Sequence, residues 1–283
     1  MAATRAPPRK DRPITTAMKD RIAAFLVLAA LAGCQARPTA PIGSVAAPPA
    51  ERSAESLYRA PPEVVAAAVE SGGRLCLEGR AAPGDRVRLA SPGGQAFYAD
   101  AGRDGVWKLT LTDTAEPRLY GLAMMDHGRL VQSQGYVALL PGGGGALLRA
   151  GAGARPLDMA AAGPAILAVD FDSKGGAVVS GVAGAGAALQ LWLDGARRLN
   201  GRAGSDGAFS LALNEPLTFT THRFEVIDGA HHADLAVAFS PAGALTAGPY
   251  RAAPMGGGWR IDWITPGGGL QTTLLLTRPG AAA

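Results

Sequence analysis

Hydrophobic and polar residues alternate with a period of two in several short stretches of the chain. The stretch ALQLWL at 188–193 has a leucine at every second position, and AFSLAL at 208–213 places Phe209, Leu211 and Leu213 in the same way. An Asp-Gly pair directly follows the first stretch and another directly precedes the second. Alternation of this kind, bounded by Asp-Gly turns, is typical of antiparallel β-hairpins. The pattern therefore predicts strands joined by tight turns.

The same pattern occurs twice. Residues 101–111 read AGRDGVWKLTL and residues 203–213 read AGSDGAFSLAL, an offset of 102 residues. The likeness extends without a gap over 87–111 and 189–213, which predicts an internal repeat of strand-turn-strand units. Within each copy, Asp104 and Asp206 are expected to be turn carboxylates that precede a glycine tolerant of positive φ.

A weaker echo follows each copy. Residues 135–156 align without gaps to 258–279, an offset of 123, and both segments contain a Pro/Gly-rich loop. We expect each module to close with a hairpin around that loop. The larger offset places about 21 extra residues in the second copy, within 228–257. The stretch 151–164 is then the connection between the modules.

The first copy resembles a family of small bacterial envelope modules. The segments GRAAPGDRVRL and ADAGRDGVWKLTL resemble Ig-like or carboxypeptidase-regulatory-like β-sandwiches. The matching positions are Gly79, Pro83, Gly84, Asp104, Gly105 and Trp107. The second copy has Ala185 in place of the proline and Phe209 in place of the tryptophan. The resemblance implies a role in spacing, adhesion or assembly.

These patterns predict an all-β chain with two tandem antiparallel Ig-like β-sandwich modules, 72–156 and 163–279, after a signal peptide and a disordered Pro/Ala-rich tether. Composition agrees, because the chain has 39 Gly and 21 Pro with 18% charged and 6% aromatic residues, which suits a turn-rich β protein. A tether at 34–71 follows from its alanine and proline content and its scarcity of large apolar residues.

The N-terminus predicts export. From Met18, an alternative start to Met1, a charged segment leads into an apolar run at 22–31 that is too short for an ordinary transmembrane span. We expect 1–33 to be a signal peptide. The stretch LAGC that ends at Cys34 resembles the lipobox of bacterial lipoproteins, which implies lipidation of Cys34 and a bilayer as partner. By the same resemblance, Gln35 favours the outer over the inner membrane of the cell envelope.

The net charge of +4 does not indicate nucleic acid as a partner. Residues 1–33 hold six basic and two acidic residues, which accounts for the whole excess, since 6 − 2 = 4. The remaining chain is neutral and poor in aromatic residues, whereas nucleic-acid binding needs clustered Lys and Arg.

The sequence contains no nucleophile, phosphate-loop or dinucleotide motif, so we expect no catalytic residues, no cofactor and no enzyme activity. No two histidines have metal-ligand spacing, and no metal site is expected. Asp170 and Asp172 lie at strand spacing but offer too few oxygen ligands for calcium, which predicts a solvated strand face. Cys76 has no disulfide partner once Cys34 is acylated and is predicted to be a buried, unreactive residue.

Trp192 is the candidate interaction residue, with Gln190 and Asp194 beside it. Alternation places its ring on the outer face of the second sandwich, where a large apolar surface indicates a contact. Packing against the other module or the extra segment is one interpretation, and contact with a partner is the other. The predicted function is a structural, assembly or protein-interaction role with an envelope protein partner. The alternative is binding of carbohydrate or peptidoglycan.

Overall fold

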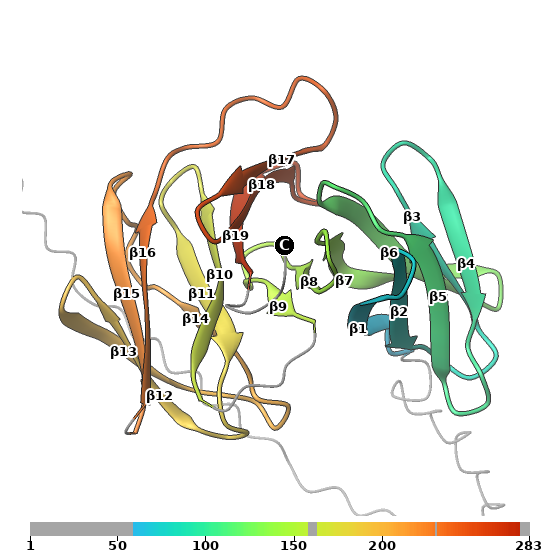
Figure 1. Cartoon of the computed structure of the whole chain (residues 1–283), viewed down its shortest axis with the longest axis horizontal. Helices are drawn as coiled ribbons and strands as arrows, with labels where there is room; N and C mark the ends of the chain where they lie inside the picture. The colour runs from blue at the N-terminus through green and yellow to red at the C-terminus, as the bar shows by residue number, and fades with distance from the viewer. Residues whose placement is uncertain (1–58, 158–162, 230, 278–283) are drawn as a thin grey trace, which may run out of the picture. The chain divides into compact units, whose positions relative to one another are not determined.

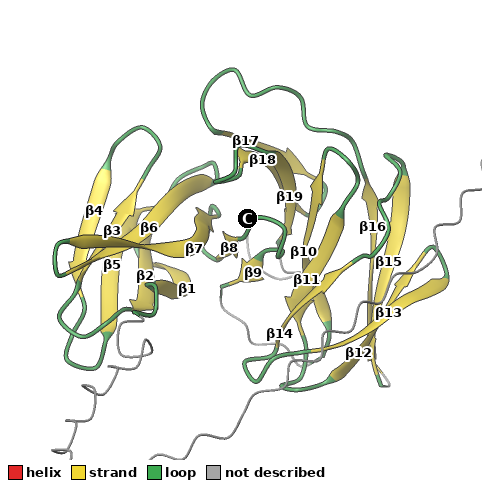
Figure 2. Ribbon diagram, turned by 180° about the vertical axis from the view of Figure 1, so that it is seen from behind, coloured by secondary structure: helices red, strands yellow, loops and turns green. Residues whose placement is uncertain are grey.

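The computed structural model describes residues 59–157, 163–229 and 231–277, and every regular element within them is a β-strand (Figure 2). These residues belong to one compact unit. They form two modules, each made of two antiparallel sheets with a hydrophobic core between them (Figure 1). This arrangement confirms the predicted all-β fold class.

Module 1 contains β1 to β9. Its smaller sheet has the order β1-β2-β5 and its larger sheet the order β4-β3-β6-β7-β8-β9. The strands of the smaller sheet are β1 (Glu63–Glu70), β2 (Arg74–Arg80) and β5 (Val106–Thr112). Those of the larger sheet are β3 (Arg86–Ala90), β4 (Ala96–Asp100), β6 (Arg118–Asp126), β7 (Arg129–Leu139), β8 (Gly145–Leu148) and β9 (Arg155–Pro156).

Module 2 contains β10 to β19. One sheet has the order β14-β11-β10-β19-β18-β17 and the other β13-β12-β15-β16. The strands of the first are β10 (Ala165–Asp172), β11 (Ala177–Val182), β14 (Ala208–Ala212), β17 (Tyr250–Met255), β18 (Gly258–Ile264) and β19 (Leu270–Leu276). Those of the second are β12 (Ala188–Leu193), β13 (Ala196–Arg202), β15 (Thr221–Asp228) and β16 (His231–Ala238).

The two modules share one strand arrangement. In each, the first, second and fifth strands form one sheet and the fourth, third, sixth and seventh form the other. Such a division is typical of Ig-like and fibronectin-III-like sandwiches. The copies diverge after the seventh strand. In module 1, β7 itself pairs with β8, whereas in module 2 the chain leaves β16 and adds the β17-β18-β19 meander beside β10.

The repeated turn has the same geometry in both modules. Asp104 Oδ1 accepts a hydrogen bond of 3.0 Å from the Val106 N–H, and Asp206 Oδ1 accepts one of 3.0 Å from the Ala208 N–H. The glycines that follow the two aspartates have φ of 75° and 82°, a conformation that glycine adopts without steric cost. The shared Asp-Gly pair therefore forms the same turn in both modules.

The two copies also share a glycine that lies opposite a buried aromatic ring. Trp107 on β5 lies opposite Gly79 on β2, and a Cβ on that glycine would be 2.3 Å from the ring. In module 2, Phe209 lies opposite Gly181 in the same way, with a Cβ-to-ring distance of 2.8 Å. The absent side chain in each case makes room for a ring that is almost fully buried.

A third hydrophobic cluster joins the modules. Its members from module 1 are Leu119, Ala138, Leu140, Ala146, Leu148 and Ala154, and those from module 2 are Ala168, Ile261, Trp263 and Leu275. Trp263 is fully buried, and its Nε1 donates a hydrogen bond of 3.0 Å to Thr273 Oγ1. The Tyr136 ring packs edge-on against it, with ring centroids 5.7 Å apart. The modules therefore share a continuous apolar junction.

Strand β1 lies inside the range 34–71 that composition assigns to the tether. It pairs with β2, and its Val64 and Ala67 are buried in the core of module 1. Composition gave no strong signal for a strand in the run VVAAAV, because its alanines favour neither a strand nor a tether. In the structure these residues nevertheless pack as a strand. The ordered module therefore begins at Glu63 or earlier, and the tether prediction is wrong for 63–70.

We expect Trp107→Ala to lower the free energy of unfolding by about 3 to 5 kcal/mol, because it leaves a large cavity opposite Gly79. Urea denaturation followed by far-ultraviolet circular dichroism measures the change. Thr112→Ala, at an exposed position on the same strand, is the matched control and should shift stability by less than about 0.5 kcal/mol. Similar small effects from both variants would contradict the buried position of the ring.

Candidate functional site

Trp192 lies in the middle of an exposed sheet face. Leu191 and Leu193 on either side of it are buried, so the indole ring is on the outer face of β12, where it is half-buried. Its Nε1 donates a hydrogen bond of 3.3 Å to Gln190 Oε1. The residue opposite on β15 is Glu225. The structure thus places two of the three candidate interaction residues together.

Arginine and acidic side chains share this face. Arg197 on β13 lies directly opposite Trp192. Farther across the sheet, Arg223 Nη2 forms an ion pair of 2.9 Å with Asp234 Oδ1 on β16. We call Gln190, Trp192, Arg197, Arg223 and Glu225 the tryptophan face. A tryptophan among arginines matches the residue types that are enriched in protein interfaces.

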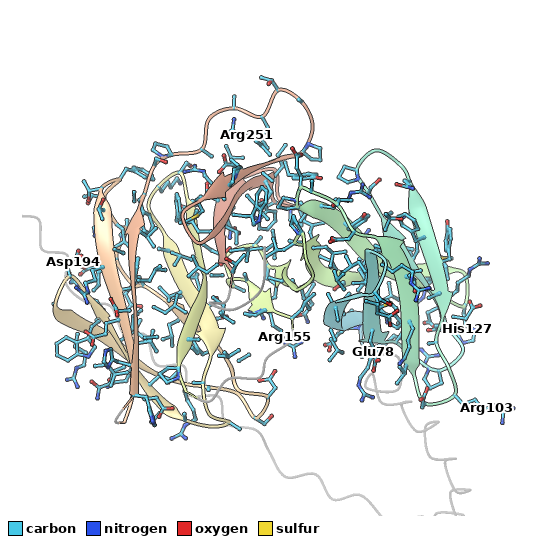
Figure 3. The ribbon with its side chains drawn as sticks, viewed as in Figure 1. Glu78, Arg103, His127, Arg155, Asp194 and Arg251 are labelled. Carbon is cyan, nitrogen blue, oxygen red and sulfur yellow. The ribbon has the colours of Figure 1, made fainter. Side chains whose placement is uncertain are left out.

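Asp194 is the third candidate, and both oxygens of its carboxylate form hydrogen bonds within module 2. It lies at the β12–β13 turn with φ of 52°, at the outer end of module 2 (Figure 3). One carboxylate oxygen accepts a hydrogen bond of 2.9 Å from the Arg223 N–H and the other lies 2.7 Å from His222 Nδ1. These hydrogen bonds, first the one from the Arg223 backbone and then the one from His222, lower the pKa of the Asp194 carboxyl. Both oxygens therefore hold the turn in place.

His222 was not predicted from the sequence as a partner of Asp194. The imidazole is 8% exposed, and it lines a pocket of about 360 Å³ together with Asp194 and Thr218. Its Nε2 lies 3.0 Å from the Thr218 carbonyl oxygen and 3.3 Å from the hydroxyl of the same residue. Period-two alternation places His222 on the inner face of β15, but it does not show which turn faces the ring.

The Thr218 hydroxyl, the His222 imidazole and the Asp194 carboxylate are neighbours in space, as in a nucleophilic triad. Their contacts do not have the geometry of such a triad. A general base at Nε2 needs a free lone pair that can take the hydroxyl proton. Nε2 instead lies closer to the Thr218 carbonyl oxygen, at 3.0 Å, than to the Thr218 hydroxyl, at 3.3 Å, and the carbonyl has no proton to give. The imidazole therefore acts as a clamp between the 214–220 loop and the β12–β13 turn.

A buried carboxylate lies at the junction, that of Asp170 on β10, which is 1% exposed. Its Oδ1 accepts hydrogen bonds from the Thr273 hydroxyl and, at 3.2 Å, from Gln271 Nε2. Its Oδ2 accepts one of 2.8 Å from the N–H of Ala154, in the segment that connects the modules. The prediction of a solvated strand face is wrong for Asp170, because the connecting segment covers that face.

Burial sets the protonation behaviour of Asp170. Desolvation raises the pKa of this carboxyl to about 6, although the hydrogen bonds from Thr273, the Ala154 N–H and Gln271 partly oppose the shift. Asp262 shows the contrast on β18. Desolvation raises its pKa as well, but hydrogen bonds from Arg251 and Thr272 and the charge of Arg260 more than offset this and lower it. Asp172, two residues from Asp170, is exposed and accepts turn hydrogen bonds.

Two arginines at the end of module 1 form polar contacts with module 2. Arg155 forms ion pairs with Asp206 at 3.0 Å and with Glu63 on β1 at 3.7 Å (Figure 3). Arg149 Nη2 donates a hydrogen bond of 3.2 Å to Ser210 Oγ on β14. Asp206 therefore serves the repeated turn with one oxygen and the junction with the other.

The structure describes one of the two cysteines. Cys34 lies outside the described residues. Cys76 is a free thiol on β2, half-buried, with its Sγ 3.7 Å from Thr110 Oγ1. The sequence predicts a buried residue, but Leu75 and Leu77 occupy the core side of the strand. Over 59–157, 163–229 and 231–277, no helix is long and apolar enough to cross a bilayer.

Neither a protein-family model nor a curated protein matches the chain. Among solved structures, it is similar to the "Biofilm associated protein - BSP domain", at 12% identity and a TM-score of 0.24. That match covers 65% of this chain and 30% of the other, so the chain spans less than a third of that protein. The "Central Fibronectin-III array of RIM-binding protein" matches at 13% identity and a TM-score of 0.27, covering 73% and 79% of the two chains.

We expect Asp170→Asn to remove a pH-dependent part of the folding stability. The pKa is about 6 in the folded protein against 3.8 ordinarily, so the folded protein binds more protons between these values. The contribution is fully present below pH 3.8 and is lost as pH rises through 6. The stability of wild type relative to Asp170→Asn should therefore be greater at pH 5 than at pH 7.5, by on the order of 1 kcal/mol.

Urea denaturation at the two pH values measures this difference. Asp172→Asn, which changes an exposed carboxylate two residues away, is the control and should keep the wild-type pH dependence. A wild-type profile that Asp170→Asn leaves unchanged would show that the carboxyl does not titrate in this range.

Proposed function

We propose that the chain is a lipid-anchored protein of the bacterial cell envelope with a structural, assembly or protein-interaction role. The acyl groups would be carried by Cys34, a Pro/Ala-rich tether would follow, and the two β-sandwich modules would present the binding surface. The LAGC pattern before a short apolar run supports the anchor. Gln35 supports the outer membrane as the location.

The observation that carries the proposed structural role is the shared apolar junction. Because Trp263, Tyr136 and the alanines and leucines around them form one cluster, the tether would carry a single two-module body. A body of this kind suits a spacer or scaffold.

The tryptophan face supports a protein as the partner. A half-buried indole flanked by Arg197 and Glu225 offers an apolar centre with a charged rim. Buried tryptophans surrounded by polar rims contribute much of the affinity in protein complexes. The neutral charge of 34–283 fits a partner bound through local contacts more than through long-range electrostatic attraction.

Binding of carbohydrate or peptidoglycan is the second candidate function. It is favoured by one observation, the hydrogen bond that places the Gln190 amide beside the Trp192 ring. A sugar site commonly pairs an aromatic face with hydrogen-bonding side chains. The corresponding position of module 1 is Ala90, so the platform is not repeated, and the carboxylate of Asp194 is engaged elsewhere.

Cys34→Ser should abolish acylation and release the protein from the membrane fraction, because each buried CH₂ of an acyl chain contributes about 0.8 kcal/mol of membrane affinity. Fractionation of cells labelled with a radioactive fatty acid tests this. The matched control is Cys76→Ser, which should keep both label and membrane association. Acyl label that persists in the Cys34 variant would refute the proposed anchor.

Trp192→Ala should reduce recovery of envelope protein partners at least tenfold after in-cell crosslinking, while the free energy of unfolding changes by less than about 1 kcal/mol. Val65→Ala removes an exposed apolar side chain from module 1 and is the control. The wild-type protein should not sediment with purified peptidoglycan. Sedimentation that is lost in Trp192→Ala would favour the carbohydrate function instead.

A further inference from the structure

Module 1 has an exposed apolar surface that the proposed function does not use. Tyr98, Met125 and Leu130 have exposed fractions of 49%, 43% and 49%, and they are three of the seven exposed large hydrophobic residues of the described chain. All three lie on the outer face of the larger sheet, on β4, β6 and β7. Single exposed apolar residues scattered over a surface are ordinary, whereas a contiguous group of them indicates an interaction site.

The strand register makes them neighbours. Leu130 lies opposite Met125, Met125 lies opposite Arg86, and Tyr98 lies opposite Arg88 on the same strand as Arg86. Adjacent strands are about 4.8 Å apart, so the four strands carry one continuous surface. We call Arg86, Arg88, Tyr98, Met125 and Leu130 the hairpin patch.

The patch is cationic as well as apolar. The guanidinium of Arg86 lies 4.7 Å from the centre of the Tyr98 ring. Arg129, the first residue of β7, lies on the opposite face from Leu130 and pairs with Asp126 at 3.4 Å, and His127 in the β6–β7 turn points outward (Figure 3). Asp100 lies opposite Arg86, with its Oδ1 4.0 Å from Arg86 Nε, so the patch holds two arginines and one neighbouring acid. Apolar side chains beside arginines are the composition that suits the surface of a bilayer with anionic lipids.

The described chain begins at the end of the β6–β7 hairpin, on the side of the sheet opposite Met125. Arg59, its first residue, forms an ion pair of 3.1 Å with Asp126, whose side chain is 4% exposed and which directly follows Met125. The 24 residues from Gln35 to Tyr58 separate this point from Cys34. By composition, a proline-rich chain of that length would reach at most roughly 75 Å, at about 3.1 Å per residue.

We propose that the hairpin patch docks on the bilayer surface that carries the lipid anchor, with anionic phospholipid headgroups against its arginines and Met125 and Leu130 at the acyl boundary. The inference rests on the proposed anchor at Cys34. A few apolar contacts bind a membrane weakly in free solution. A short tether raises the effective concentration of the patch at the surface to the millimolar range, so that weak contacts become populated.

The test uses the chain from Gln35 to Ala283, which contains all three hydrophobic clusters, with an N-terminal hexahistidine tag held by nickel-chelating lipid. The vesicles contain phosphatidylcholine, alone or with phosphatidylglycerol. Amide hydrogen exchange of 125–130 is compared for bound and free protein. We expect exchange to slow at least roughly threefold on the anionic vesicles, and less on phosphatidylcholine alone.

Met125→Ser combined with Leu130→Ser should remove this protection. Val65→Ser combined with Phe219→Ser deletes two exposed apolar side chains elsewhere and should leave it unchanged. The Asp194-Gly195 turn of module 2 reports any general effect of the vesicle and should exchange at the same rate in both states.

Three outcomes would overturn the docking: equal exchange in bound and free protein, equal slowing at the module 2 turn, or slowing that appears only after envelope proteins are added. The last would assign the patch to a protein partner. Because the tag replaces the acyl groups, these results are independent of whether Cys34 is acylated in cells. Failure of the anchor is detected separately by fractionation of the Cys34→Ser variant.

Discussion

Burial of the outer face of β10 and β19 against module 1 is the constraint on which the rest of the structure depends. In an isolated sandwich that face would be solvated. Here Ala168 and Leu275 on it belong to the junction cluster, and Asp170 lies beneath the connecting segment. Burial of a carboxylate is costly unless hydrogen bonds compensate for the lost water, so the junction must supply donors as well as apolar contacts.

The donors come from both modules. Thr273 and Gln271 reach Asp170 from the neighbouring strand, and the Ala154 N–H reaches it from the connecting segment. Gln271 also accepts a hydrogen bond of 3.3 Å from the Gly151 N–H. Separating the modules would therefore expose Trp263 and leave this polar network without its partners from the connection. For that reason the stability of module 2 depends on module 1.

Much of the fold follows from local chemistry that the sequence shows directly. Period-two leucines predict the inward side of β12, and the Asp-Gly turns and their glycines are the same in both copies. Local patterns do not reveal whether an outward face is covered. Asp170 was expected in solvent for that reason. Cys76 was expected inside because cysteine is a small hydrophobic residue, although the leucines on either side of it take the inner face of β2. The pairing of His222 with Asp194 depends on two turns far apart in the chain, which alternation cannot show.

Comparison of the two copies indicates which outward face is covered. Glu78 and Lys108 on the outer face of β2 and β5 form an exposed ion pair of 2.9 Å. The residues 102 positions later are Ser180 and Ser210, whose hydroxyls lie 3.2 Å apart on β11 and β14, with Ser180 fully buried.

The neighbouring outward position on β11 changes from Cys76 to Val178, which is buried, whereas Ser210 and Ala212 on the edge strand β14 are exposed. A face that loses its charges in only one of two repeats is one that has come to be covered, because buried ion pairs are costly and small neutral side chains allow close approach. The small neutral residues at 178 and 180 are therefore explained by the junction, because Gly153 of the connecting segment packs closely over this part of β11.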